Sequence, residues 1–280
     1  MRLFRIIQNV CCFLIFIPII HCAKKSDSKK TIYSFYVVGH AYGNPNNPQL
    51  GLYKPFKESI KQLNASPNLE LAFFTGDVVV FPTFDYWNQA LSDLKAIDAE
   101  VHIAPGNHDK GQAFNQLVGK YNYSFHRNGD LFVVLTPEDW CIRGEGYNVL
   151  WDALHDNITE VNNIFIFTHE LIWWSPDNEF KTVKINFEPH FPGRTNFKDS
   201  ILPLLKNVQK PIYWFAGDLG CKPEVSAYMY HQDANVHLIG SGLGNGENDN
   251  LVMVGVNEDH HVELSFIGLK KSGFRVFEQH

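Results

Sequence analysis

The chain has 280 residues, of which 45% are hydrophobic and 19% are charged, enough for one large globular domain or two small ones. Its formal net charge is −6, and an acidic balance of this kind gives no electrostatic footprint for nucleic acid. Composition therefore excludes a generally basic nucleic-acid-binding protein and agrees with an ordinary soluble enzyme surface, although a local basic patch is compatible with it.

The first 23 residues have the three parts of a secretory signal peptide. Arg2 and Arg5 precede an uncharged apolar run, Val10–Ile20, and a polar stretch follows. The run is shorter than the about 20 residues that a membrane-spanning helix needs. We therefore expect residues 1–23 to be a signal peptide or a lipoprotein signal, with a lipid anchor at Cys22 as the alternative. Either form predicts an exported protein, periplasmic or secreted, whose only route to membrane association is its N-terminus.

Residues 24–31 are predicted to be a polar linker, and residues 32–280 a single domain of alternating elements. Short apolar runs bounded by turn formers predict six buried strands: Ile32–Gly39, Leu69–Thr75, Glu100–Ala104, Leu131–Thr136, Asn163–Thr168 and Pro211–Ala216. Helical spacing predicts four helices: Tyr53–Asn64, Phe84–Asp98, Gly146–Asp156 and Ser200–Val208. Strands without helices then follow: Val236–Ile239, Leu251–Val256 and His261–Ile267. This order predicts an α/β fold in which two packed sheets are flanked by helices.

A long stretch without a predicted element, Leu171–Phe197, is rich in tryptophan and phenylalanine. One interpretation is a loop that packs on the core. The other is a lid or a wall of a substrate site, because long connections of this kind are often functional.

Polar side chains follow three of the predicted strands at their carboxyl ends. The strings are Phe74-Thr75-Gly76-Asp77, then Ala104-Pro105-Gly106-Asn107-His108-Asp109, and later Phe165-Ile166-Phe167-Thr168-His169-Glu170. Open α/β sheets bind their ligands at this edge. Aspartate and asparagine offer oxygen ligands to a metal, and a neighbouring histidine can move a proton. The strings therefore predict metal-assisted hydrolysis of a phosphoester.

In order and spacing, from about Tyr33 to Phe266, these strings resemble the calcineurin-like metallophosphoesterase family. Its motif blocks run Asp-x-His, Gly-Asp, Gly-Asn-His-Asp/Glu, His and Gly-His-x-His. The resemblance implies a four-layer α/β/β/α fold, a two-sheet β-sandwich flanked by helices, with two metals about 3.5–4 Å apart. It implies a phosphoesterase that hydrolyses a phosphomonoester or phosphodiester through a metal-activated water, and the predicted signal peptide adds that this enzyme is exported.

The resemblance also assigns roles to individual residues. The candidate metal ligands are His40, Asp77, Asn107, His169 and Asp218. His108, oriented by Asp109, is the expected acid or transition-state dyad, which would protonate the leaving oxygen. Glu170 is expected to point away from the site, because neighbours on an extended segment face opposite sides.

Two blocks depart from the family pattern. Val38 stands where the first block has its aspartate, and Asp218 and Gly220 replace the two histidines of the last block. One metal position keeps most of its ligands, whereas the other keeps only His40 and the shared Asp77. We therefore expect one strong site for a divalent metal and a second site that is weak or absent. The oxygen-rich ligand set favours Mn²⁺ or Mg²⁺, with Fe and Zn as alternatives.

The lost ligands leave a second hypothesis open, a catalytically degenerate binding protein with the same fold. The complete Gly106-Asn107-His108-Asp109 string favours the enzyme. Export and the aromatic stretch suggest a small-molecule, glycan-linked or lipid-linked phosphoester as the substrate.

Overall fold

The structure is a computed structural model, and it describes residues 29–156, 158–188, 195–269 and 275–280. The predicted signal peptide, with Cys22, lies outside the described residues. Over the described part, five α-helices are present: α1 Lys54–Asn64, α2 Phe84–Leu94, α3 Gln112–Leu117, α4 Gly144–His155 and α5 Leu202–Asn207. A π-helical turn, Phe197–Ile201, leads into α5.

The strands form two six-stranded mixed sheets. The first has the order β12-β11-β10-β1-β2-β3. Its strands are β1 Thr31–Gly39, β2 Leu69–Thr75, β3 Glu100–Ala104, β10 Asn250–Asn257, β11 Val262–Gly268 and β12 Arg275–Gln279. The second has the order β4-β5-β6-β7-β9-β8. Its strands are β4 Tyr123–Arg127, β5 Asp130–Val134, β6 Ile164–Thr168, β7 Ile212–Ala216, β8 Tyr228–Asp233 and β9 Val236–Ser241.

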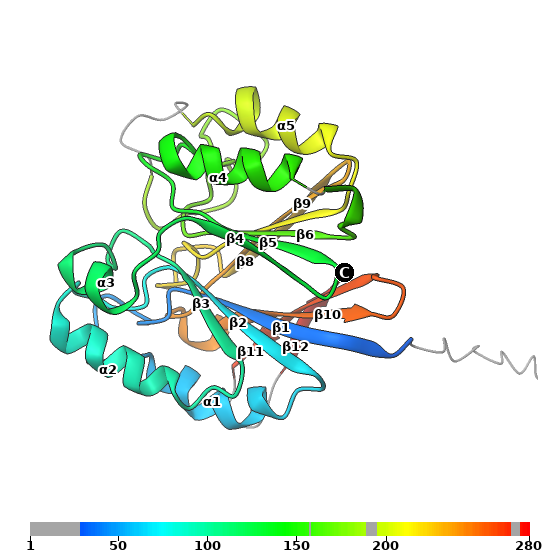
Figure 1. Cartoon of the computed structure of the whole chain (residues 1–280). Helices are drawn as coiled ribbons and strands as arrows, with labels where there is room; N and C mark the ends of the chain where they lie inside the picture. Colours follow the sequence, from blue (N-terminus) through cyan, green and yellow to red (C-terminus); the bar gives the residue numbers. More distant parts are fainter. Residues whose placement is uncertain (1–28, 157, 189–194, 270–274) are drawn as a thin grey trace, which may run out of the picture.

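The two sheets lie face to face, with helices on both outer faces (Figure 1). Helices α1, α2 and α3 lie outside the first sheet, and α4 and α5 lie outside the second. The predicted α/β architecture, a two-sheet sandwich flanked by helices in four layers, is confirmed.

The core between the sheets is built largely from phenylalanine. The ring centroid of Phe35 in β1 lies 5.5 Å from that of Phe73 in the same sheet and 5.0 Å from that of Phe165 in the other sheet. The next residue, Tyr36, points the other way and contacts Phe56 of α1. Because both faces of these strands are buried, their sequences are nearly continuous apolar runs, which made them predictable.

Parallel strands of both sheets end at one edge of the sandwich, where glycines let the two backbones touch. Strands β1, β2 and β3 are parallel in one sheet, as are β6 and β7 in the other. A Cβ atom on Gly217 would lie 1.8 Å from the carbonyl oxygen of Thr75, and one on Gly39 would lie 2.4 Å from the carbonyl oxygen of Gly217. The residues that follow strands of the two sheets therefore meet at this edge.

Among the described residues, three strands and one α-helix were not predicted, and one predicted helix is too long. Strands β4 and β8 are edge strands with partly exposed faces, β12 is a third edge strand, and α3 has only six residues, so apolar periodicity is weak in all of them. The helix predicted over Phe84–Asp98 ends at Leu94. Tight turns follow, in which the amide of Ile97 donates to the carbonyl of Leu94, and these turns keep Ile97 buried without continuing the helix.

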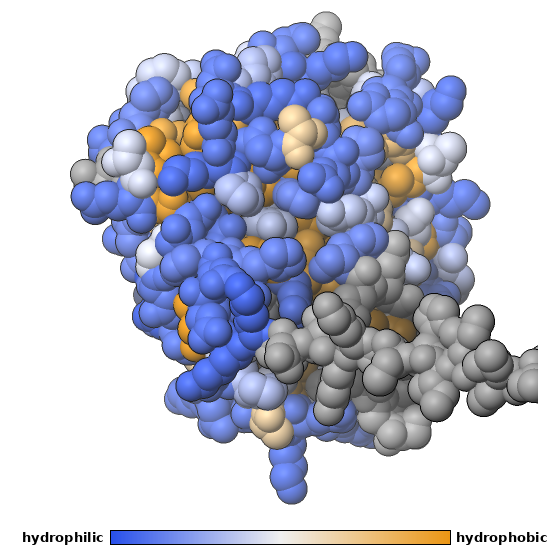
Figure 2. Space-filling model, turned by 90° about the vertical axis from the view of Figure 1, so that its right-hand side faces the viewer, coloured by the Kyte–Doolittle hydropathy of each residue, from blue (hydrophilic) through white to orange (hydrophobic). Residues whose placement is uncertain are grey.

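No helix of the described residues is long and apolar enough to cross a membrane. Figure 2 shows the face of the molecule at the right of Figure 1, and hydrophilic residues cover most of it outside the grey atoms. Hydrophobic residues appear there in separate groups.

Candidate metal centre and adjoining cavity

Four buried side chains from both sheets meet where the parallel strands end. His40 follows β1, Asp77 follows β2, His169 follows β6 and Asp218 lies just after β7. His40 Nε2 lies 3.2 Å from Asp77 Oδ2, and His169 Nε2 lies 3.4 Å from Asp77 Oδ1. Asp218 Oδ1 lies 3.9 Å from His40 Nε2 and 3.8 Å from His169 Nε2. The structure thus brings together four of the five predicted ligands.

Backbone contacts orient both histidines in the way that metal-ligating histidines require. The Nδ1 atom of His40 lies 3.1 Å from the carbonyl oxygen of Gly43, and that of His169 lies 2.9 Å from the carbonyl oxygen of Thr75. A carbonyl oxygen can only accept, so each Nδ1 carries the proton and each Nε2 presents a lone pair. Metal-ligating histidines are held by this same kind of second hydrogen bond.

The unprotonated nitrogens and the carboxylate oxygens of this cluster face one another. Asp77 Oδ2 and His169 Nε2 are buried and have no hydrogen-bond partner. Imidazole nitrogen and carboxylate oxygen are ordinary ligands of divalent metals, so the donor set fits such an ion. Among the described residues, no three His, Cys, Asp or Glu side chains are already spaced around a metal position. Metal binding would therefore include a local rearrangement of the donors.

Burial shifts the ionisation of all four groups toward their neutral forms. It raises the pKa of Asp77 to about 6 and, together with the charge of Asp77, holds the pKa of Asp218 well above its usual range. It also lowers the pKa of His40 and of His169. A divalent cation bound among these groups would act in the opposite sense on the aspartates, because it favours their charged form.

Asn107 and His108 lie beside this cluster. Asn107 is exposed and lines an adjoining cavity that also reaches Asp218. His108 is half-buried, its Nδ1 lies 2.9 Å from the carbonyl oxygen of Val80, and its backbone amide donates to Asp77 Oδ1 at 3.3 Å. Because the carbonyl oxygen of Val80 can only accept a hydrogen bond, Nδ1 of His108 carries the ring proton, and Nε2 is the ring nitrogen left to exchange a proton.

The expectation that Asp109 orients His108 is wrong for this structure. The buried Asp109 carboxylate accepts three backbone hydrogen bonds, from the amides of Val78, Val79 and Gly106. These bonds join the loop after β2 to the loop after β3. Burial and the charge of Asp77 raise the pKa of Asp109 to about 7. Asp109 therefore holds the two loops that carry Asp77 and His108, while a backbone carbonyl orients His108.

Two further residues contact the cluster that were not found from sequence. The buried ring of Tyr42 lies between two histidine rings, with its centroid 4.7 Å from that of His40 and 5.3 Å from that of His108. Asn186 reaches in from the loop between β6 and β7, and its Nδ2 atom lies 3.1 Å from Asp218 Oδ1. Tyr42 lies two residues after the predicted ligand His40, and this closeness in sequence could have placed it near the cluster. Asn186 belongs to no motif, so nothing in the sequence pointed to it.

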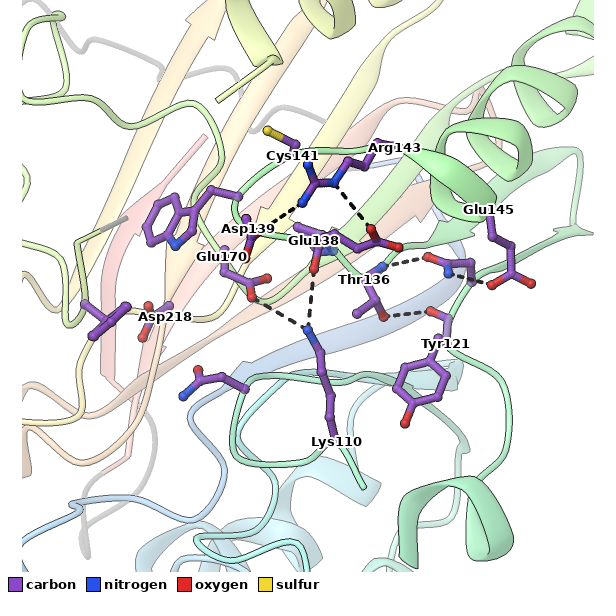
Figure 3. A pocket seen from close by; sticks show the side chains of 15 residues that line it. Lys110, Tyr121, Thr136, Glu138, Asp139, Cys141, Arg143, Glu145, Glu170 and Asp218 are labelled. Carbon is purple, nitrogen blue, oxygen red and sulfur yellow. Dashed lines mark hydrogen bonds and ion pairs between the residues drawn. The ribbon is translucent and has the colours of Figure 1, made fainter. Parts of the chain in front are cut away.

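A cavity of about 1030 Å³ adjoins the cluster, a size that suits a small-molecule ligand. Figure 3 shows Lys110 reaching across it toward Glu170, whose Oε1 lies 4.0 Å from the Lys110 Nζ. Trp140 and Phe187 supply apolar wall. Glu170 does not point away, as expected from strand alternation, because β6 ends at Thr168 and the chain bends there. Lys110 is thus a cation beside the predicted metal ligands.

Asp249 closes the glycine-rich loop after β9, and this contact predicts a pH-dependent stability. Its Oδ1 accepts from the amides of Gly244 and Gly246, while burial raises its pKa to about 6. This value lies above the about 3.9 of an unfolded chain, so the folded state binds the proton more tightly and loses stability as pH rises through this window. Relative to wild type, Asp249→Asn is expected to gain about 1.4 kcal/mol in the free energy of unfolding per pH unit across it. Urea denaturation between about pH 4 and pH 7 measures this, and a pH-independent difference would contradict it.

Comparison with known proteins gives one family match and two distant structural likenesses. The family model for calcineurin-like phosphoesterases matches residues 26–229. No protein among the curated ones matches the chain. The structure of Chaetomium thermophilum Vps29 is 12% identical, covers 89% of this chain and 96% of its own, and has a TM-score of 0.40. A putative 5′-nucleotidase from Staphylococcus aureus, in complex with alpha-ketoglutarate, is 12% identical and covers 88% of this chain, with a TM-score of 0.43. The match spans 53% of that nucleotidase chain, and both TM-scores are too low to carry an argument.

Proposed function

Because the chain belongs to the calcineurin-like phosphoesterase family, we propose that it is an exported, metal-dependent phosphoesterase acting on a phosphomonoester or phosphodiester. One observation carries the proposal: two buried histidines and two buried aspartates turn unprotonated nitrogens and carboxylate oxygens toward each other. Two carboxylates balance the charge of one divalent ion. The export part of the proposal rests on residues 1–23 alone.

His40, Asp77, His169 and Asp218 are the residues that would hold the metal. Bound there, a divalent metal supplies charge neutralisation for the phosphoryl oxygens and activation of water. The mixed nitrogen and oxygen donor set suits Mn²⁺, with Mg²⁺, Fe²⁺ and Zn²⁺ as alternatives. One strong site is proposed, because Val38 turns its apolar side chain into the core under the helices.

The chain's own residues bind and orient the phosphoester. Lys110 places a positive charge in the cavity beside Asn107, where a phosphoryl group would lie next to the cluster. Trp140 and Phe187 offer apolar surface to the rest of the substrate. We propose a small-molecule, glycan-linked or lipid-linked phosphoester, whose leaving oxygen takes its proton from Nε2 of His108 in its doubly protonated form, which leaves the neutral ring with its proton on Nδ1.

His108→Gln tests this proton transfer. The variant is expected to lower kcat about 10²–10⁴-fold, because glutamine cannot supply the proton. The dissociation constant for metal should stay unchanged, and both constants should match wild type in His126→Gln, a variant of an exposed histidine on β4. An unchanged kcat in His108→Gln would show that the proton comes from another group.

A specific observation favours a second candidate, a binding protein with a degenerate metal site. Gly220 stands where the family has a histidine, and it adopts a φ of 75° with no room for a side chain, since a Cβ atom would lie 2.4 Å from the carbonyl oxygen of Gly242. A side chain could be restored at this position only with a shift of the surrounding backbone. A protein of this kind would keep the cavity and lose turnover.

One experiment separates the two candidates. The purified protein, freed of metal, is assayed on an aryl phosphomonoester and an aryl phosphodiester with added Mn²⁺, Mg²⁺, Zn²⁺ or Fe²⁺, and its thermal unfolding is followed in parallel. Turnover with at least one metal, together with a metal-dependent rise in Tm, supports the enzyme. Absence of turnover and of a thermal shift with every metal supports the binding protein.

A further inference from the structure

The loop between β6 and β7 brings an amide into the predicted metal cluster. Asn186 Nδ2 lies 3.3 Å from His40 Nε2 and 3.1 Å from Asp218 Oδ1. Resting on the proposed function, we infer that Asn186 is an additional ligand, whose amide oxygen binds the divalent metal that His40, Asp77, His169 and Asp218 would hold. This residue lies outside the motif blocks by which the other ligands were predicted.

The side-chain amide of Asn186 lies within hydrogen-bond distance of two atoms of the cluster that could also bind a metal. His40 Nε2 and Asp218 Oδ1 are both acceptors, since Nδ1 of His40 carries its proton, and an amide N–H donor is what two acceptors attract. With a cation present, both lone pairs face the ion, and an N–H group beside it is repelled. Rotation of the side-chain amide by about 180° exchanges nitrogen for oxygen without moving the backbone, because the two atoms have nearly the same size.

Asn186 also lies on the side of the cluster that lacks ligands. His40 marks the metal position that has lost its first-block aspartate to Val38 and its distal histidine to Gly220. Neither replacement has a side-chain atom that can bind a metal, because Val38 is apolar and Gly220 has no side chain. A side-chain carbonyl oxygen is an ordinary ligand for Mg²⁺, Ca²⁺ and Mn²⁺. It adds no charge, so the two aspartates still balance one divalent ion.

The backbone around Asn186 is held in place from two directions. The amide of Ser226 donates to the carbonyl of Lys184 at 2.8 Å, and the amide of Lys184 donates to the Ser226 hydroxyl at 2.9 Å. The indole of Trp174 donates to the carbonyl of Val183 at 3.0 Å. These contacts lie two and three residues before Asn186. The side chain is therefore positioned by the fold, as a ligand needs to be.

Calorimetric titration of Mn²⁺ into the metal-free protein tests this role with wild type, Asn186→Ala, Asn186→Asp and Thr182→Ala. Thr182 is an exposed residue of the same loop and serves as the matched control. If Asn186 is a ligand, Asn186→Ala raises the dissociation constant about tenfold or more, by analogy with residues that support metal sites. Asn186→Asp keeps an oxygen at the position and binds Mn²⁺ at least as tightly as wild type, and Thr182→Ala binds like wild type.

The opposite results overturn the inference in distinguishable ways. Tighter binding by Asn186→Ala would mean that the amide blocks the metal position and leaves when metal binds. Equal binding by wild type and Asn186→Ala would mean that Asn186 contributes no ligand, while the proposed function stands. Absence of Mn²⁺ binding by wild type and all variants would overturn both the inference and the proposed metal dependence.

Discussion

Replacement of Asp77 by Asn is expected to abolish the metal-dependent thermal stabilisation of this protein and to lower kcat about 10²–10³-fold or more. The two carboxylate oxygens of Asp77 face the two histidines, with Oδ2 near His40 and Oδ1 near His169. Asparagine has the same shape and tolerates the φ of 53° that Asp77 adopts, so the local backbone should be kept. The substitution removes the charge that a divalent ion needs and little else.

Two thermal measurements check this expectation. At free Mn²⁺ about 100 times its dissociation constant, binding stabilises wild type by about 2.7 kcal/mol, a rise in Tm of roughly 5–10 °C. Asp77→Asn should show no rise, whereas Asp98→Asn, at an exposed position, should show the full one. In metal-free buffer Asp77→Asn should unfold at the wild-type temperature or higher, because a buried oxygen without a hydrogen-bond partner has been removed. A full metal-dependent shift in Asp77→Asn would exclude this cluster as the metal site.

The fold could be predicted where burial dictates the residue pattern. Strand β2 matches its predicted bounds, Leu69–Thr75, because a strand between a second sheet and a helix layer needs apolar residues on both faces. Strand β3 is an edge strand and also matches its predicted bounds, Glu100–Ala104, through the buried residues of its second half. Strand β4 has no such signal, since its residues alternate between exposed and half-buried at the edge of its sheet. Edge position is a property of the assembled sheet, and no local pattern encodes it.

The candidate site, like the fold, has a part that could be predicted from the sequence and a part that could not. Each of the four clustered side chains follows a strand closely, so sheet topology brings them to one edge. The resemblance of their motif strings to the calcineurin-like family was the signal that singled them out in the sequence. The partners of Asp109 and the place of Asn186 depend instead on how loops from separate elements pack. Asp109 is next to His108 in sequence, yet its carboxylate turns to three backbone amides because these amides are buried and need an acceptor. Loop packing of this kind leaves no periodic trace in the sequence.

The meeting of the two sheets at the site predicts that Gly217→Ala will damage the protein severely. A Cβ atom there would lie 1.8 Å from the carbonyl oxygen of Thr75, which is backbone and cannot swing aside as a side-chain end does. The cost is expected to reach or exceed the upper end of the roughly 1–3 kcal/mol typical of overpacking. Urea denaturation measures it, and insoluble expression would be the extreme form of the same result.

Gly255→Ala is the matched control for Gly217→Ala and separates the steric effect from the loss of a glycine. Gly255 lies in β10, and a Cβ atom there would meet Thr31 Cγ2 at 3.7 Å, an ordinary contact. This variant is expected to be neutral or stabilising by up to about 1 kcal/mol, because alanine reduces the entropy of the unfolded chain. Equal stability of the two variants would show that the sheets can separate at no cost.

The carbonyl that Gly217→Ala displaces is also the one that accepts from His169 Nδ1, so a soluble Gly217→Ala protein should bind Mn²⁺ more weakly than Gly255→Ala. The close contact between the sheets and the orientation of the predicted ligand His169 thus both depend on glycine at position 217, which has no side chain.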